Sequence, residues 1–177
     1  MLPYIRQIEN LGACQKSIAW LREQNHPSLE AAWAACQRGD WMLWLLAETV
    51  GPAGDPARVP LVLAACDCVE LTLPLIPAEG RHAPLQALDT ARAWTRGEAT
   101  KAELRAVYDR VTDAAMPFQP LNMPAFVAAR AIGAVVYLPF TILPTGFVTQ
   151  YGATNPDTFA RGADLVRAHF PNPPVLE

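Results

Sequence analysis

Apolar side chains recur every three or four positions through most of the chain, which is the spacing of an amphipathic helix. The first such run predicts a helix over 11–24. Its apolar positions are Leu11, Cys14, Ile18 and Leu21. The pair His26-Pro27 ends it, and the hydroxyl of Ser28 is suited to cap a second helix that passes through Cys36.

The tripeptide Arg38-Gly39-Asp40 is interpreted as the boundary between two helices. Gly39 accepts the left-handed backbone of a helix C-cap, and Arg38 favours the negative end of the helix dipole. The carboxylate of Asp40 is expected to cap the next helix, Trp41 to Thr49, which Gly51 closes.

The remaining helices follow from the same signals. The run from Pro60 to Leu73 contains only two charges, Asp67 and Glu70, three residues apart on one stripe, and it is expected to be the central helix. Three more helices are predicted over 83–96, 124–138 and 156–169, the first ended by Gly97. Thr100 and Glu103 form a capping-box pattern ahead of another helix. The buried face of that helix is expected to be Leu104, Val107, Tyr108, Val111 and Ala115.

About eight helices joined by short loops rich in Pro and Gly predict an all-α fold, a compact multi-helix bundle. We expect residues 1–177 to form a single helical domain. Residues 11–115 make its core, and 116–177 add an apolar helix, an irregular arm and a final helix packed on that core. The arm, 139–152, has no helical period and is rich in β-branched residues, which allows a short strand.

Composition excludes several classes of protein. The chain of 177 residues is 51% apolar and only 18% charged, and its formal net charge is -3. A disordered chain would have more charge, and a nucleic-acid binder would have a basic excess. The uncharged stretch between Arg130 and Asp157 contains too many Pro, Gly and Thr residues to cross a membrane. No secretory signal is recognised at the N-terminus, so a cytoplasmic location is expected.

Local motifs for catalysis or metal binding are absent from the sequence. Cys66 and Cys68 are separated by one residue, Asp67, on a helix, which turns their thiols about 200° from each other. These two, with Cys14 and Cys36, are interpreted as buried, reduced thiols inside apolar helices. There is no nucleophile elbow and no phosphate-binding loop. We therefore expect no catalytic residue, no cofactor and no metal site, and Asp67 and Glu70 are interpreted as a solvated stripe.

The five tryptophans are numerous for a chain of this length. Core packing is the favoured explanation, and a groove lined by tryptophan is the alternative. Trp41 and Trp44 are three residues apart and are expected to share a face.

Several stretches resemble a family of bacterial and phage helical domains known as putative immunity proteins. The resemblance covers about residues 11–105 and is most specific at Arg38-Gly-Asp-Trp-Met-Leu-Trp-Leu45. The other stretches are Gly12-Ala-Cys14, Ala19-Trp-Leu21, Ala32-Trp33 with Cys36, Leu61-Val-Leu-Ala-Ala-Cys66, Leu73-Pro74 and Ala93-Trp-Thr-Arg-Gly-Glu-Ala99.

The resemblance implies a non-enzymatic protein that neutralises a cognate toxin by direct protein–protein contact. The residues expected to bind the partner are Asp40, Trp41, Trp44 and Glu48. Two other classes stay open: an enzyme whose site is assembled from separated residues beside the arm, and a self-associating module that forms a homodimer through the 124–138 helix. No nucleic-acid or membrane partner is expected.

Overall fold

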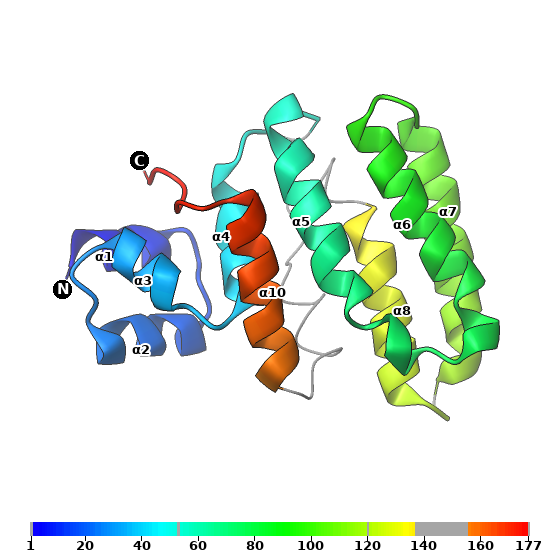
Figure 1. Ribbon diagram of the computed structural model, residues 1–177, viewed down its shortest axis with the longest axis horizontal. Helices are drawn as coiled ribbons and strands as arrows, with labels where there is room; N and C mark the ends of the chain where they lie inside the picture. Colours follow the sequence, from blue (N-terminus) through cyan, green and yellow to red (C-terminus); the bar gives the residue numbers. More distant parts are fainter. Residues whose placement is uncertain (1, 53, 120, 137–155, 177) are drawn as a thin grey trace.

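The computed structural model describes residues 2–52, 54–119, 121–136 and 156–176, and within these ranges the regular structure is helical throughout (Figure 1). The α-helices are α1 (Pro3–Asn10), α2 (Gln15–Gln24), α3 (Leu29–Ala35), α4 (Gly39–Thr49), α5 (Val59–Glu70), α6 (His82–Thr95), α7 (Lys101–Ala115), α8 (Met123–Val135) and α10 (Pro156–His169). Single turns of 3-10 helix occur at Pro56–Arg58, Leu73–Leu75, Ala78–Gly80 and Met116–Phe118. The predicted all-α fold is confirmed.

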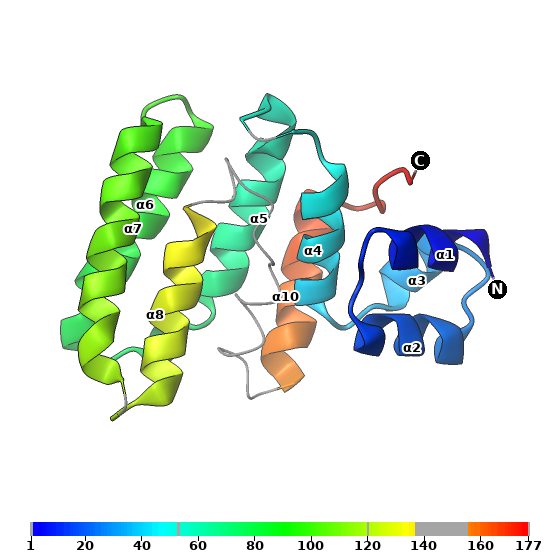
Figure 2. The ribbon, with the colours of Figure 1, turned by 180° about the vertical axis from the view of Figure 1, so that it is seen from behind.

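The helices form three groups along the long axis of the molecule (Figures 1 and 2). The short helices α1, α2 and α3 lie at one end, and α6, α7 and α8 lie at the other. Between them α4 and α10 pack against each other, and α10 also packs on α5. The C-terminal segment after α10 returns toward α1 and α3, where the amide of Gln7 donates to the carbonyl of Leu176 at 3.5 Å.

Local capping signals place most helix ends where the sequence predicts them. Thr100 Oγ1 accepts from the backbone N–H of Glu103 at 3.3 Å, and the Glu103 carboxylate accepts from the N–H of Thr100 at 2.7 Å. Ser28 caps α3 through the N–H of Ala31. Gly97, at φ +75, follows α6 as expected.

Helix α5 is the central helix, as predicted, and contacts α4, α6, α8 and α10. Its two charges lie on a partly exposed stripe that also links helices. Arg92 of α6 donates to Asp67 at 3.1 Å and to Glu70. His169 of α10 lies 2.8 Å from the other Asp67 oxygen. The stripe therefore ties three helices together at the surface.

The N-terminal segment differs from its prediction. Residues Pro3–Asn10 form a helix that was not predicted, with Pro3 at its first turn and Tyr4, Ile5 and Ile8 buried. The second helix begins at Gln15 and not at position 11, because Gly12 has a φ of +90, which interrupts the helical backbone.

The interpretation of Arg38-Gly39-Asp40 is also wrong in detail. Helix α3 already ends at Ala35, and Gly39 is the first residue of α4 and not a left-handed C-cap. Gly39 is needed because α10 crosses there: a Cβ atom at this position would lie 2.5 Å from the backbone carbon of Gly162. Asp40 lies in the first turn of α4, where its carboxylate accepts from Arg38 and does not cap the helix.

The four cysteines are free, as expected, and Cys36, Cys66 and Cys68 are buried. Cys14 is exposed at the residue before α2, so the prediction of a buried thiol is wrong there. The arm 139–152 and its suggested strand lie outside the described residues. Within the described ranges, no helix is long and apolar enough to cross a membrane.

Candidate functional site: an aromatic cavity beside α4

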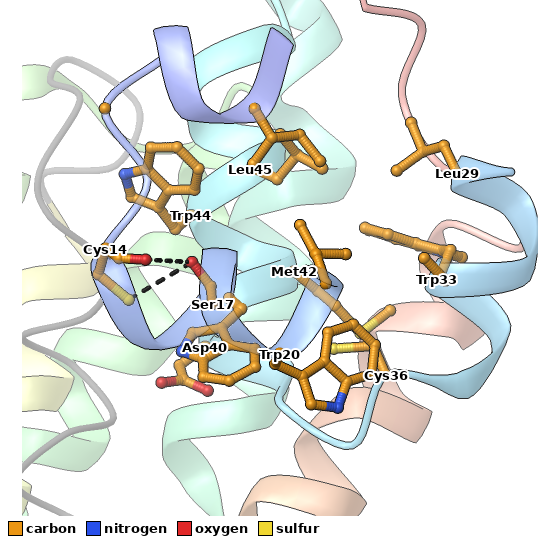
Figure 3. Close-up of a pocket in the computed structure, with 15 residues that line it drawn as sticks. Cys14, Ser17, Trp20, Leu29, Trp33, Cys36, Asp40, Met42, Trp44 and Leu45 are labelled. Carbon is orange, nitrogen blue, oxygen red and sulfur yellow. Dashed lines mark hydrogen bonds between the residues drawn. The ribbon is translucent and has the colours of Figure 1, made fainter. Parts of the chain in front are cut away.

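A cavity of about 330 Å³ lies where α2 and α3 meet α4 (Figure 3). Four tryptophans contribute to its wall: Trp20, Trp33, Trp41 and Trp44. Aliphatic side chains such as Leu29, Met42 and Leu45 supply most of the remaining surface. A cavity of this volume with predominantly apolar walls falls within the range of small ligand sites.

Helical spacing explains how these side chains converge. Cys14, Ser17 and Trp20 are three residues apart and line the cavity from the start of α2. Trp41 and Trp44 line it from α4, which confirms that they share a face. The rings of Trp20 and Trp41 meet at a centroid distance of 5.9 Å in a tilted arrangement, a favourable geometry for aromatic pairs.

The wall formed by α3 is fixed from outside by α10 and the residue that follows it. The indole N–H of the buried Trp33 donates to the carbonyl of Phe170 at 3.0 Å. Arg167 donates through Nη1 to the carbonyls of Cys36 at 2.8 Å and Trp33 at 3.2 Å. These bonds supply donors to carbonyls at the C-terminal end of α3, where the helical ladder ends, and the Trp33 carbonyl also accepts from the N–H of Cys36 at 3.4 Å.

The charges at the edge of the cavity neutralise each other. Arg38 donates to Asp40 through Nε at 2.8 Å and through Nη2 at 2.5 Å, a bidentate pair. The hydrogen bond to Asp40 raises the pKa of Arg38. The guanidinium also lies over the rings of Trp41 and Phe159, at 4.4 and 4.2 Å from their centroids. The buried carboxylate of Asp40 is therefore paired.

Three of the four residues expected to bind a partner line this cavity. Trp41 and Trp44 are half-buried. Asp40 also lines it but is only 1% exposed, so its position supports a role in holding Arg38. Glu48 lies one turn beyond Trp44, half-buried and outside the cavity lining, and burial raises the pKa of its carboxyl. Their partner-binding role remains a prediction.

Cys14, Ser17, Trp20 and Trp33 are not among the residues predicted to bind a partner, although a groove lined by tryptophan is the alternative that the sequence leaves open. The spacing of Cys14, Ser17 and Trp20 was visible, but the predicted helix began too early and treated Cys14 as core. The contribution of Trp33 depends on how α3 packs against α4 and α10, which no local pattern encodes.

The contrast between Cys14 and the other thiols gives a direct test of this geometry. Burial raises the pKa of Cys36 to about 11 and the pKa values of Cys66 and Cys68 to about 12. Since the thiolate is the reactive form, these three should be protected. We expect the native protein to consume one equivalent of a disulfide reagent rapidly at pH 8, and four in denaturant. Fast labelling of two or more thiols in the native protein would contradict the packing described.

No group of three or more His, Cys, Asp or Glu side chains able to hold a metal ion occurs within the described ranges. Among its described residues the cavity has one carboxylate, that of Asp40, and both of its oxygens accept from Arg38. Its other polar side chains include Ser17, whose hydroxyl donates to the carbonyl of Cys14 at 2.8 Å. The described lining is therefore aromatic and aliphatic, with few polar side chains.

A comparison with protein families matches residues 55–138 to the Imm-5 like putative immunity protein family. The match confirms the family resemblance for this segment, which runs from the 3-10 turn at Pro56–Arg58 through α8. The resemblance noted over 11–105 overlaps it from residue 55 to 105. The cavity residues all precede the matched segment. No curated protein and no solved structure matches the chain.

Proposed function

Because residues 55–138 match the Imm-5 like putative immunity protein family, we propose that this chain is a non-enzymatic binding protein that neutralises a partner toxin. The family match is the observation that carries the proposal. The toxin would be bound by direct protein–protein contact, and it would be recognised in the cytoplasm of the cell that makes both proteins.

We propose that the partner contacts the part of α4 that carries Trp41, Trp44 and Glu48. Trp41 and Trp44 are half-buried, so part of each residue stays accessible, and the Trp41 ring is held by contacts with Trp20 and Arg38. Such residues dominate the binding energy of many interfaces, because a large apolar side chain is held in place before the partner arrives. Glu48, one turn away, adds a carboxylate that is already partly desolvated. Asp40 supports this surface indirectly by fixing Arg38 against Trp41.

The proposal is tested by capturing the tagged full-length chain from its native cells, with an untagged control, and identifying what is retained. A captured protein counts as the partner only if it inhibits growth when expressed alone and if co-expression of this chain restores growth. A captured protein that is harmless when expressed alone would contradict the neutralising function.

The interface is tested with that partner by replacing Trp44 with Ala and, separately, Glu48 with Lys. We expect Trp44→Ala to weaken binding at least about tenfold, as loss of an anchoring aromatic residue does. Isothermal titration calorimetry measures the affinity, and circular dichroism checks the fold of each variant.

Trp94→Ala provides the matched control, because Trp94 is another half-buried tryptophan and lies in α6 at the other end of the molecule. We expect it to bind the partner within about twofold of the unmodified chain. If Trp94→Ala weakens binding and Trp44→Ala does not, the interface lies in the segment 55–138 that matches the family and not on α4.

A further inference from the structure

We propose that the cavity beside α4 binds a small, neutral, planar aromatic molecule of about two fused rings. This proposal goes beyond toxin neutralisation, because it concerns the interior of the cavity and requires no partner protein, although the cavity shares Trp41 and Trp44 with the proposed interface. Three observations define the ligand: the volume, the charge balance and the walls of the cavity.

The volume sets the size of the ligand. A dry apolar cavity of roughly 150 Å³ is large enough to hold benzene in a protein core. The cavity described here is about 330 Å³, about twice that volume, so two fused rings fill it. Cys14 and Gly12 are exposed residues of its lining, which gives a ligand a route of entry.

The charges at the cavity favour a neutral ligand. Among the described residues of the lining, Asp40 has the only ionised side chain, and both of its carboxylate oxygens accept from Arg38. An anionic ligand would meet this carboxylate inside an apolar wall and lose its hydration. A cationic ligand would have to compete with the guanidinium of Arg38, which makes two charge-assisted hydrogen bonds to Asp40 and lies over the rings of Trp41 and Phe159.

The aromatic walls of the cavity favour an aromatic ligand. Trp20, Trp41 and Trp44 offer ring surfaces to one space, and aromatic rings prefer tilted or offset contacts with one another. Trp33 uses its indole N–H on Phe170. The indole N–H groups of Trp20, Trp41 and Trp44 donate to no described residue.

The test compares two probes with the same rings, 2-naphthamide and 2-naphthoate, titrated into the full-length chain. We expect saturable binding of the neutral amide with a dissociation constant on the order of 100 μM, a reasonable affinity for a ligand of this size. We expect the anionic naphthoate to bind at least about tenfold more weakly. Bound amide should also slow the reaction of Cys14 with a thiol reagent.

Two variants test whether the amide binds inside the cavity. Cys14→Phe puts a ring into the mouth from an exposed position and should abolish binding of the amide. Gln15→Phe adds the same ring at the next residue, which is exposed and outside the lining, and should leave binding within about twofold. The proposal is overturned if the amide does not bind saturably, if naphthoate binds equally well, or if Cys14→Phe binds normally. Since no partner is present, none of these results bears on toxin neutralisation.

Discussion

Replacement of Arg58 by Met is expected to lower the free energy of unfolding by about 3 kcal/mol, the usual cost of removing one member of a buried charged interaction. Arg58 is 0% exposed, at the end of the turn that leads into α5. Its Nη1 donates to the carbonyl of Gly51 at 3.0 Å, beyond the C-terminus of α4. The side chain therefore ties the end of α4 to the start of α5 across the loop between them.

Arg58→Met lowers the free energy of unfolding because it leaves two groups, the Gly51 carbonyl and the Glu48 carboxylate, without the guanidinium. Burial lowers the pKa of Arg58, and the nearby carboxylate of Glu48 opposes that shift. Met has a similar length, so the change deletes the charge and the hydrogen bonds while it retains most of the packing. The Gly51 carbonyl then loses this donor, and Glu48 loses the neighbouring cation.

Urea denaturation of the two proteins measures the effect, and an unchanged slope would show that only stability has changed. Arg105→Met is the control, because Arg105 is 68% exposed and pairs with Asp109 within one helix. That variant should stay within about 0.5 kcal/mol of the parent protein. A loss below about 1 kcal/mol for Arg58→Met would mean that the buried guanidinium is dispensable.

Nothing in the sequence around Arg58 marks it as a core residue. It follows a Pro and Gly-rich loop, where an exposed arginine is the ordinary expectation. Its burial depends on the packing of the turn before α5 against the end of α4, where it bonds to Gly51. By contrast, the capping box at Thr100 and Glu103 was predictable, because a helix N-terminus is determined by side chains within one turn.

The same distinction applies to the candidate site. Three-residue spacing correctly placed Trp41 and Trp44 on one face, since that face follows from helix geometry alone. Whether the face is core or surface depends on which helices cover it. Burial of Asp40 was missed for this reason, because a carboxylate in the first turn of a helix is usually explained by the helix dipole. The bidentate bond from Arg38 to Asp40 depends on the turn between α3 and α4. The sequence predicts that turn at the wrong residues, because α3 ends at Ala35 and α4 begins at Gly39.

A glycine at position 39 has two possible explanations, and the local sequence does not distinguish between them. Glycine is favoured at left-handed helix ends and also where two backbones approach closely. The neighbouring Asp40, a residue suited to cap a following helix, favours the first explanation. The second is correct, and it depends on Gly162, which is 123 residues away in the sequence.

A pair of alanine substitutions at this crossing is expected to give opposite results. A Cβ atom on Gly39 would lie 2.5 Å from the backbone carbon of Gly162 and 2.7 Å from the nitrogen of Ala163. Neither backbone atom can rotate away, so α4 and α10 must separate. We expect Gly39→Ala to cost about 3 kcal/mol, at the upper end of ordinary overpacking. A Cβ atom on Gly162 would meet only ordinary contacts, 3.7 Å from the sulfur of Cys68 and 3.9 Å from Gly39.

Gly162→Ala should therefore leave stability unchanged or raise it by up to about 1 kcal/mol, because alanine is the better helix former inside α10. Thermal unfolding followed by circular dichroism measures both variants. The separation of α4 from α10 should also disturb the cavity, since Trp41 and Trp44 are carried by α4 and α10 holds the wall at Trp33. Gly39→Ala should thus lose 2-naphthamide binding at temperatures where it is still folded, whereas Gly162→Ala should keep it. Equal stability of the two variants would show that the helices do not cross at these glycines.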